Sequence, residues 1–382
     1  MALDLTDYHP TPDVARASTL PARWYLDPEI LAAEQDAIFA RTWQWAGPSA
    51  RLGDPGAYMT FDVAGDPLFA VRGRDGLARA FWNVCAHRAG RIVEGCGTAP
   101  ALQCRYHGWT YGLDGRLKRA REMEGVEGFR PEEVRLREAR LEELPPMAFV
   151  NLDPIAPSLH EFLGEIPAEI EAAGFRLDEL EHFERRDYTL EANWKVYVDN
   201  YLEGYHVPIA HPGLYRAIDY DRYEVAPRRF HSAQYAPLRS GDATRRMLGR
   251  DRRYLRSDDE ERALYYWIFP NLMLNLYADN LQLNAIVPLG LDRTLTIFEW
   301  FVAPGMTDER RARLAGSIAF SDEIQREDIE VCEAVQRGLR SRAYDAGRFS
   351  ARRENGVHHF HLLLHEFLSR PRQGDRVPGP VG

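Results

Sequence analysis

The chain has 382 residues, of which 45% are hydrophobic and 28% charged, and its 48 Lys and Arg against 58 Asp and Glu give a formal net charge of −10 at pH 7. This length predicts two or three domains, each large enough to bury a core. The acidic balance argues against a nucleic-acid-binding protein, which normally carries a basic stripe. No apolar run reaches the roughly 18 residues of a membrane span. The polar N-terminus lacks the features of a signal peptide, so we expect a cytoplasmic protein without a membrane partner.

The first half of the chain predicts a helix followed by a β region. Residues 24–45 begin with a helix signal, because Asp27 can cap the N-terminus and Pro28 suits the first helical position. Residues 55–155 contain short apolar alternations separated by Asp-Gly turns. Short strands at this spacing are typical of a small antiparallel β domain.

The second half predicts a mixture of helices and strands. Apolar periodicity predicts helices over residues 158–173, 193–206, about 307–340 and 357–368. Strands are predicted over 183–192 and in four apolar segments between 263 and 302. Pro208 is expected to end the helix before it, and the charged residues 219–260 predict an irregular surface excursion.

These elements predict an α+β protein with two domains. A small antiparallel β domain, residues 45–157, is expected to be inserted near the N-terminus of a larger α+β domain formed by residues 1–44 and 158–382. In the larger domain we expect an antiparallel sheet flanked by helices.

Two short arms of the β domain each combine one cysteine with one histidine. They are Cys85-x-His87 and Cys104-x-x-His107, separated by sixteen residues. Three interpretations are open. A zinc site usually pairs Cys with Cys and His with His, and four unrelated residues would include two core cysteines. The pattern favours a Rieske [2Fe–2S] centre, in which two thiolates hold one iron and two imidazoles hold the other.

A second metal site is predicted beyond the β domain. His206 and His211 are five residues apart, a spacing that a regular helix does not place on one face, but a break at Pro208 could bring them together. Two histidines and a carboxylate form the facial triad that holds non-haem Fe(II) and leaves positions open for O₂ and substrate. Spacing alone leaves four carboxylates open as the third ligand, all on the predicted helix 307–340: Asp322, Glu327, Asp328 and Glu330.

Several segments resemble the Rieske non-haem iron oxygenases. CAHR (85–88) and CRYHGW (104–109) resemble the paired arms of these alpha subunits, although Arg105 stands where the family usually has Pro. Four further segments resemble the branch that contains choline monooxygenase and carnitine oxygenase, so the similarity spans nearly the whole chain. They are NWKVYVDNYLEGYH (193–206), YYWIFPNLMLNLYADN (265–280), REDIEVCEAVQRGLRSRAYDAGRF (326–349) and HHFHLLLH (358–365).

The resemblance implies two sets of metal ligands. The [2Fe–2S] cluster would be held by Cys85, His87, Cys104 and His107, and the mononuclear Fe(II) by His206, His211 and Asp328. Many members have an Asp three residues before the first iron histidine, which connects that site to the cluster of the neighbouring subunit. The resemblance implies this role for Glu203, with Asp199 as the alternative.

The implied function is that of the terminal oxygenase component of a Rieske system. It would activate O₂ at Fe(II) and hydroxylate or N-dealkylate a small quaternary ammonium compound such as choline, betaine or carnitine. The alternatives are an aromatic-ring-hydroxylating dioxygenase or an O- or N-demethylase of an aromatic compound and, more remotely, a Rieske electron-transfer protein or a zinc-binding interaction protein without catalysis. No G-x-G-x-x-G follows a predicted strand. The resemblance therefore implies a separate NAD(P)H-dependent flavin/iron–sulfur reductase, with or without a ferredoxin, and a homotrimer.

Aromatic residues near these segments are candidates for binding a quaternary ammonium group through their ring faces. They are Tyr201, Tyr205, Tyr215, Tyr266, Trp267 and Tyr277. Aromatic residues at such spacing more commonly belong to a hydrophobic core, so the sequence alone assigns no aromatic cage.

Overall fold

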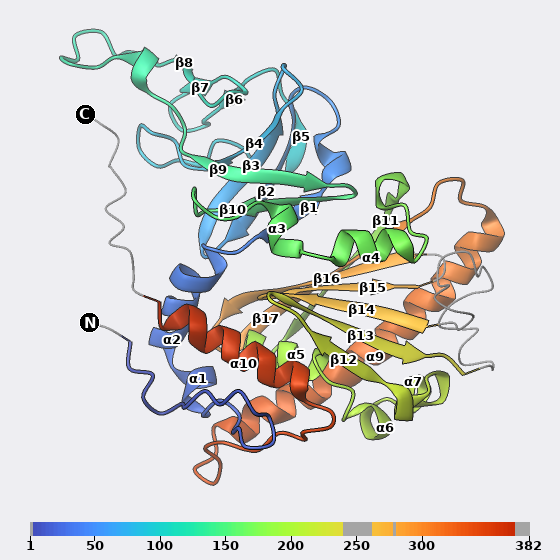
Figure 1. Ribbon diagram of the computed structural model, residues 1–382. Helices are drawn as coiled ribbons and strands as arrows, with labels where there is room; N and C mark the ends of the chain where they lie inside the picture. The colour runs from blue at the N-terminus through green and yellow to red at the C-terminus, as the bar shows by residue number, and fades with distance from the viewer. Residues whose placement is uncertain (1–2, 240–261, 278–279, 371–382) are drawn as a thin grey trace. The chain divides into compact units, whose positions relative to one another are not determined.

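The computed structural model describes residues 3–239, 262–277 and 280–370 (Figure 1). Within them the chain forms two compact units, one made of the residues up to Glu34 together with His160–Ser369, the other mainly of Gln35–Leu159. The α+β fold class predicted from the sequence is confirmed, while the expected domain limits at residues 45 and 157 stay predictions. No helix among the described residues is long and apolar enough to cross a membrane.

The unit around Gln35–Leu159 is an antiparallel β domain. Its larger sheet has the strand order β1-β10-β9-β4-β3-β2-β5 and its smaller sheet the order β6-β7-β8. The strands are β1 (Gln44–Pro48), β2 (Ala57–Val63), β3 (Asp66–Arg72), β4 (Ala78–Trp82), β5 (Cys96–Thr98), β6 (Leu102–Gln103), β7 (Thr110–Tyr111), β8 (Leu117–Arg119), β9 (Glu138–Leu144) and β10 (Met147–Asn151). The Asp-Gly turns lie where the sequence predicts them, because Gly76 and Gly115 adopt φ of 81° and 76° between successive strands.

The β domain has hydrophobic clusters on both faces of its sheet. Along β3, Leu68 packs into one cluster and its neighbour Phe69 into the other, as the two-residue period of a strand requires. The cluster around Phe69 also contains Cys85 and Cys104. The hydrophobic core of this domain therefore anchors both Cys/His arms.

The other unit contains a seven-stranded antiparallel sheet with the order β11-β17-β16-β15-β14-β13-β12. Its strands are β11 (Glu181–Leu190), β12 (Glu224–Pro227), β13 (His231–Pro237), β14 (Arg262–Ile268), β15 (Leu272–Leu276), β16 (Asn280–Gly290) and β17 (Arg293–Val302). The four strands predicted between residues 263 and 302 are confirmed. Strands β12 and β13 were not predicted. Residues 240–260 of the predicted surface excursion lie outside the described residues.

Three helices pack against this sheet or against one another: α5 (Trp194–Tyr201), α9 (Asp308–Leu339) and α10 (Asn355–Leu368) (Figure 1). Leu314 and Ile318 of α9 bury against Phe298 and Trp300 of β17. The side chain of Thr307 accepts the backbone N–H of Arg310 and so caps the start of α9.

Shorter helices complete the described chain. They are α1 (Arg23–Leu26), α2 (Pro28–Glu34), α3 (Leu159–Leu163), α4 (Ile166–Ala172), α6 (Val207–Ala210), α7 (Pro212–Ala217), the π-helical turn η1 (Gln35–Phe39) and the 3₁₀ turns η2 (Ser49–Leu52), η3 (Pro131–Glu133), η4 (Leu177–Glu179) and η5 (Tyr220–Arg222). The helix predicted from residue 24 to 45 therefore ends early, because residues from Gln44 onward pair with β10 instead.

The helix predicted over 193–206 also ends early, at Tyr201. The carboxylate of Glu203 accepts the backbone N–H groups of Tyr205 and His206, which replaces the bonds that a continuing helix would make. Pro208 does not end the earlier helix, as the sequence suggested, but lies in the first turn of α6. Proline lacks a backbone N–H, but the N–H groups of a first helical turn have no acceptor within the helix, so nothing is lost at this position.

Candidate metal centres and substrate cavity

The two Cys/His arms form loops with the same backbone hydrogen bonds. In loops 85–90 and 104–109 the N–H of the first residue donates to the carbonyl of the sixth at 2.9 Å, and the N–H of the fifth donates back to the carbonyl of the first at 2.9 and 3.0 Å. The fifth residues, Ala89 and Gly108, have left-handed φ of 56° and 73°. Two related loops therefore present the four candidate ligands.

The side chains of these loops fit an iron–sulfur cluster. Cys85 and Cys104 are free thiols that are only 3% and 2% exposed, and the His87 and His107 rings lie 4.6 Å apart. The Nδ1 atom of His87 is buried and has no hydrogen-bond partner among the described residues, as a metal ligand requires. A Cβ atom on Gly90 would come within 3.1 Å of the Cys104 sulfur. Only glycine leaves the space beside that thiol open.

Tyr111 controls the environment of one candidate cluster ligand. Its hydroxyl lies 3.2 Å from the sulfur of Cys85 and accepts the backbone N–H of Ala86 at 3.1 Å. Burial raises the pKa of the Cys85 thiol, while the hydrogen bond with Tyr111 acts in the opposite direction. Burial also raises the pKa of Tyr111, so this phenol stays protonated and can donate to a thiolate.

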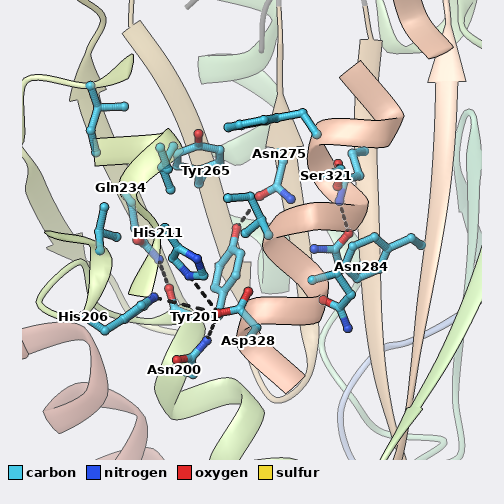
Figure 2. A pocket seen from close by; sticks show the side chains of 18 of the residues that line it. Asn200, Tyr201, His206, His211, Gln234, Tyr265, Asn275, Asn284, Ser321 and Asp328 are labelled. Atoms are coloured by element: carbon cyan, nitrogen blue, oxygen red, sulfur yellow. Dashed lines mark hydrogen bonds and ion pairs between the residues drawn. The ribbon is translucent and has the colours of Figure 1, made fainter. Parts of the chain in front are cut away.

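The second predicted site is brought together by the fold. One ligand atom from each of His206, His211 and Asp328 lies within 4.8 Å of the others (Figure 2). The Oδ1 atom of Asp328 is 3.0 Å from Nε2 of His211 and 3.9 Å from Nε2 of His206. This geometry, two imidazoles and a carboxylate on one side of a centre, suits non-haem Fe(II).

Each of these imidazoles is oriented by a carboxylate at its other nitrogen. Nδ1 of His206 is 2.6 Å from Glu203, and Nδ1 of His211 is 2.6 Å from Glu327. Such partners fix the tautomer and leave Nε2 available for a metal. Burial by itself lowers the pKa of His211, but Asp328 and Glu327 outweigh burial and raise it.

The structure distinguishes among the four carboxylates that the sequence left open as the third ligand of the iron. Asp322 binds Arg186 and Tyr188, and Glu330 is exposed. Glu327 is near the site but orients His211. The sequence did not predict this role, although the position beside Asp328 was a signal for it.

Asp199, the alternative to Glu203, faces other partners. It accepts a hydrogen bond from the Tyr25 hydroxyl at 2.6 Å and lies 2.9 Å from Nε2 of His361. The backbone N–H of Leu20 donates to Nδ1 of His361, which assigns the ring proton to Nε2. Of the two carboxylates, Glu203 is therefore the one bonded to a candidate iron ligand.

A cavity opens onto the second site, and its empty volume of about 900 Å³ includes its mouth. Five tyrosines line it: Tyr197, Tyr201, Tyr223, Tyr265 and Tyr277. The Tyr265 and Tyr277 rings meet edge to face with centroids 6.1 Å apart. Glu203 and Asp328 also line the cavity, so aromatic faces and acidic groups share one space (Figure 2).

Only two of the six aromatic candidates from the sequence, Tyr201 and Tyr277, line this cavity. Tyr205 is 57% exposed, and Tyr266 is fully buried in the core with its hydroxyl bonded to Glu169. The remaining two lie off the cavity: Tyr215, which packs on Tyr220, and Trp267, which is fully buried. Tyr266 was a candidate from the sequence, but its neighbour Tyr265, which lines the cavity, was not. Neighbouring residues of a strand point to opposite faces, so only one of the two can reach the cavity.

Comparison with known proteins agrees with both sites. Residues 42–130 match the Rieske [2Fe-2S] domain, and residues 177–370 match the catalytic domain of the ring-hydroxylating alpha subunits. The chain belongs to the Rieske oxygenase alpha subunits. It is the catalytic subunit of a Rieske non-haem iron oxygenase, with a [2Fe–2S] cluster and a mononuclear iron as its cofactors. The alternatives without catalysis therefore do not hold.

The oxygenase is related to enzymes that act on quaternary ammonium compounds. It is 35% identical to the chloroplastic choline monooxygenase of Arabidopsis thaliana over 95% of this chain and 86% of that protein. It is 32% identical to the carnitine monooxygenase oxygenase subunit of Escherichia coli K12 over 91% and 93% of the two chains. A solved quaternary ammonium Rieske monooxygenase superposes with a TM-score of 0.82 at 29% identity, covering 96% of this chain and 99% of that one.

Proposed function

We propose that the oxygenase hydroxylates or N-dealkylates a small quaternary ammonium compound. The observation that carries this proposal is the tyrosine-lined cavity beside His206, His211 and Asp328. Ring faces attract a cation that cannot donate hydrogen bonds, and this attraction strengthens when the site is dry. The relatives named for choline and carnitine support the same class of substrate.

The tyrosines keep the neutral form that such binding needs. Burial raises the pKa of Tyr201, Tyr223 and Tyr265 well above the usual range, and that of Tyr277 to about 12. The carboxylates of Glu203 and Asp328 add negative potential to the cavity wall. Together these groups offset part of the cost of removing a cation from water.

The proposal assigns the metal ligands to the residues predicted from the sequence. The cluster is held by Cys85, His87, Cys104 and His107, and the iron by His206, His211 and Asp328. When bound, the two centres supply the electron and the activation of O₂. Glu203 and Glu327 keep the protons at Nδ1 of the two iron histidines, and the cavity wall orients the substrate.

The proposal also includes partners. Electrons come from a separate NAD(P)H-dependent flavin/iron–sulfur reductase, with or without a ferredoxin. The functional form is a homotrimer in which Glu203 connects the iron site of one subunit to the cluster of its neighbour. A location in the cytoplasm stays a prediction from the sequence.

The test uses the ferrous protein with nitric oxide as a probe of the iron site. After anaerobic reduction, the EPR spectrum is recorded during titration with choline, glycine betaine, carnitine and stachydrine, and separately with a panel of aromatic acids. We expect a saturable change with at least one quaternary amine. A change with an aromatic acid only would replace the substrate class by the aromatic alternative. Absence of a nitrosyl signal in iron-replete protein would contradict the assignment of a mononuclear iron site.

Two variants of one residue give the matched control. Tyr265→Leu removes a ring face from the cavity, and we expect it to weaken binding of the quaternary amine by about tenfold, which corresponds to about 1.4 kcal/mol. Tyr265→Phe keeps the ring and is expected to bind nearly as well as the natural protein. Equal losses in both variants would contradict a role for the ring face.

A further inference from the structure

We propose that the side-chain amides of Asn275 and Asn284 bind an oxygen atom of the substrate and thereby set which quaternary ammonium compounds the oxygenase accepts. This inference rests on the proposed function and deepens it. The ligand class is a quaternary ammonium compound that carries a hydrogen-bond-accepting oxygen, either a hydroxyl or a carboxylate, on one arm.

Both amides lie on the same face of the sheet, in the wall of the cavity. Asn275 on β15 stands directly opposite Gln282 on β16, and Asn284 follows two residues later on the same face. Asn275 and Asn284 are only 5% and 3% exposed, and both line the cavity (Figure 2). They are therefore close neighbours in a buried surface.

A directed series of hydrogen bonds fixes the orientation of Asn284. The Ser321 hydroxyl of α9 donates to Oε1 of Gln282 at 3.0 Å, and Nε2 of Gln282 donates to Oδ1 of Asn284 at 2.8 Å. The oxygen of Asn284 is thus occupied. Its Nδ2 group donates no hydrogen bond among the described residues, and the residue lines the cavity.

Asn275 is oriented in the same sense by a different donor. The hydroxyl of Tyr201 donates to its Oδ1 atom at 2.6 Å. The Nδ2 group of Asn275 likewise has no acceptor in the described part of the chain. Two independent contacts therefore turn both amide oxygens toward protein donors and leave both NH₂ groups as donors.

Buried donors of this kind favour a ligand that can accept from them. A buried donor left without an acceptor is unfavourable, so a ligand arm that supplies an oxygen binds better than an apolar arm of the same size. Ser321 and Asp328 are seven residues apart on α9, two helical turns on one face. The amides and the iron ligands therefore face one cavity, and a ligand held by its oxygen at the amides has a fixed orientation toward the iron.

The experiment compares ligands that differ only in this arm. Binding to the ferrous–nitrosyl protein is measured for choline, glycine betaine and propyltrimethylammonium, in which a methyl group replaces the hydroxyl of choline. We expect Asn284→Leu and Asn275→Leu each to weaken the binding of an oxygen-bearing ligand about tenfold and to change propyltrimethylammonium by less than twofold. The Rieske absorption spectrum and the iron content check that each variant is folded.

Two further variants distinguish the sources of the oxygen and guard against misfolding. Asn284→Asp can still accept from a hydroxyl but repels a carboxylate, so it should retain choline and lose glycine betaine if betaine binds here. Ser321→Ala removes only the first donor of the series and should reduce the same preference by a smaller factor.

Each outcome decides the matter. Equal loss for all three ligands, or no loss for an oxygen-bearing ligand, overturns the role of the amides and leaves the proposed function intact. A natural protein with a nitrosyl signal that binds none of these three ligands, and neither carnitine nor stachydrine, overturns the proposed function and this inference with it.

Discussion

The Nδ1 atom of His211 lies 2.6 Å from the carboxylate of Glu327. On the other side of the ring, Nε2 lies 3.0 Å from Asp328, the next residue of the same helix. One imidazole is therefore held between two consecutive acidic residues of α9. Glu327 orients the ring, and Asp328 is the candidate third ligand beside it.

Removal of Glu327 should loosen the iron without removing a ligand. We expect Glu327→Ala to weaken the binding of Fe(II) by 10–100-fold, the usual effect of losing such a partner. Competition with a chelator measures the affinity. Glu330→Ala, on the same helix but exposed, is the matched control and should bind iron normally; an equal loss there would contradict a specific role for Glu327.

Removal of His206 should separate the two metal sites. We expect His206→Ala to lose the mononuclear iron and all turnover while the visible spectrum of the [2Fe–2S] cluster persists, because the four candidate cluster ligands lie in the other compact unit. Iron analysis and absorption spectroscopy check this. Simultaneous loss of the cluster spectrum would contradict the assignment of two independent sites.

Loss of the Tyr111 hydroxyl should make the cluster harder to reduce. The hydroxyl is 3.2 Å from the Cys85 sulfur and, as a donor, stabilises the more negative reduced state. We expect Tyr111→Phe to lower the reduction potential by an amount on the order of tens of millivolts. A redox titration followed by EPR measures it, and an unchanged potential would show that the hydroxyl does not donate to the sulfur.

The buried ion pair of Glu34 and Lys195 should be sensitive to single changes. Lys195 Nζ is 2.6 Å from Glu34, both side chains are fully buried, and Trp194 donates to the same carboxylate at 2.8 Å. We expect Lys195→Met to destabilise the protein by about 3–5 kcal/mol, because it leaves an unpaired buried charge. The double variant Glu34→Gln/Lys195→Met removes that charge and keeps an acceptor for Trp194, so it should recover most of the loss in chemical denaturation.

Stability should fall with acidification, in part through His359. Burial, with His231 nearby, lowers the pKa of His359 to about 4, whereas an unfolded histidine titrates near 6.5. The unfolded chain therefore binds more protons between these values, and the contribution of neutral His359 is complete above pH 6.5 and lost as the pH falls toward 4. His359→Asn should reduce the slope of stability against pH in this window by up to about 1.4 kcal/mol per pH unit; equal slopes would contradict the burial of a neutral imidazole.

Local patterns predicted the parts of the fold that local chemistry determines. The helix expected over 307–340 is observed at Asp308–Leu339, because the Thr307 cap and the apolar period both act within the segment. The Cys/His arms, too, are recognisable by spacing alone. The fold class followed from the same signals.

Contacts between distant residues decided what the sequence could not predict. The end of α5 depends on where the Glu203 carboxylate finds its donors, and strand β13 forms because β14 pairs with it. In the site, Tyr223 joins the cavity from an irregular segment. The amide series from Ser321 to Asn284 links a helix to a strand, which no periodicity indicates.

The separation of tasks between helix and sheet has a consequence for protein engineering. The candidate iron ligands come from α9 and from the chain around α6, whereas Asn275 and Asn284 come from β15 and β16. A library that varies only these strand positions can therefore search for new substrates while the redox chemistry stays constant.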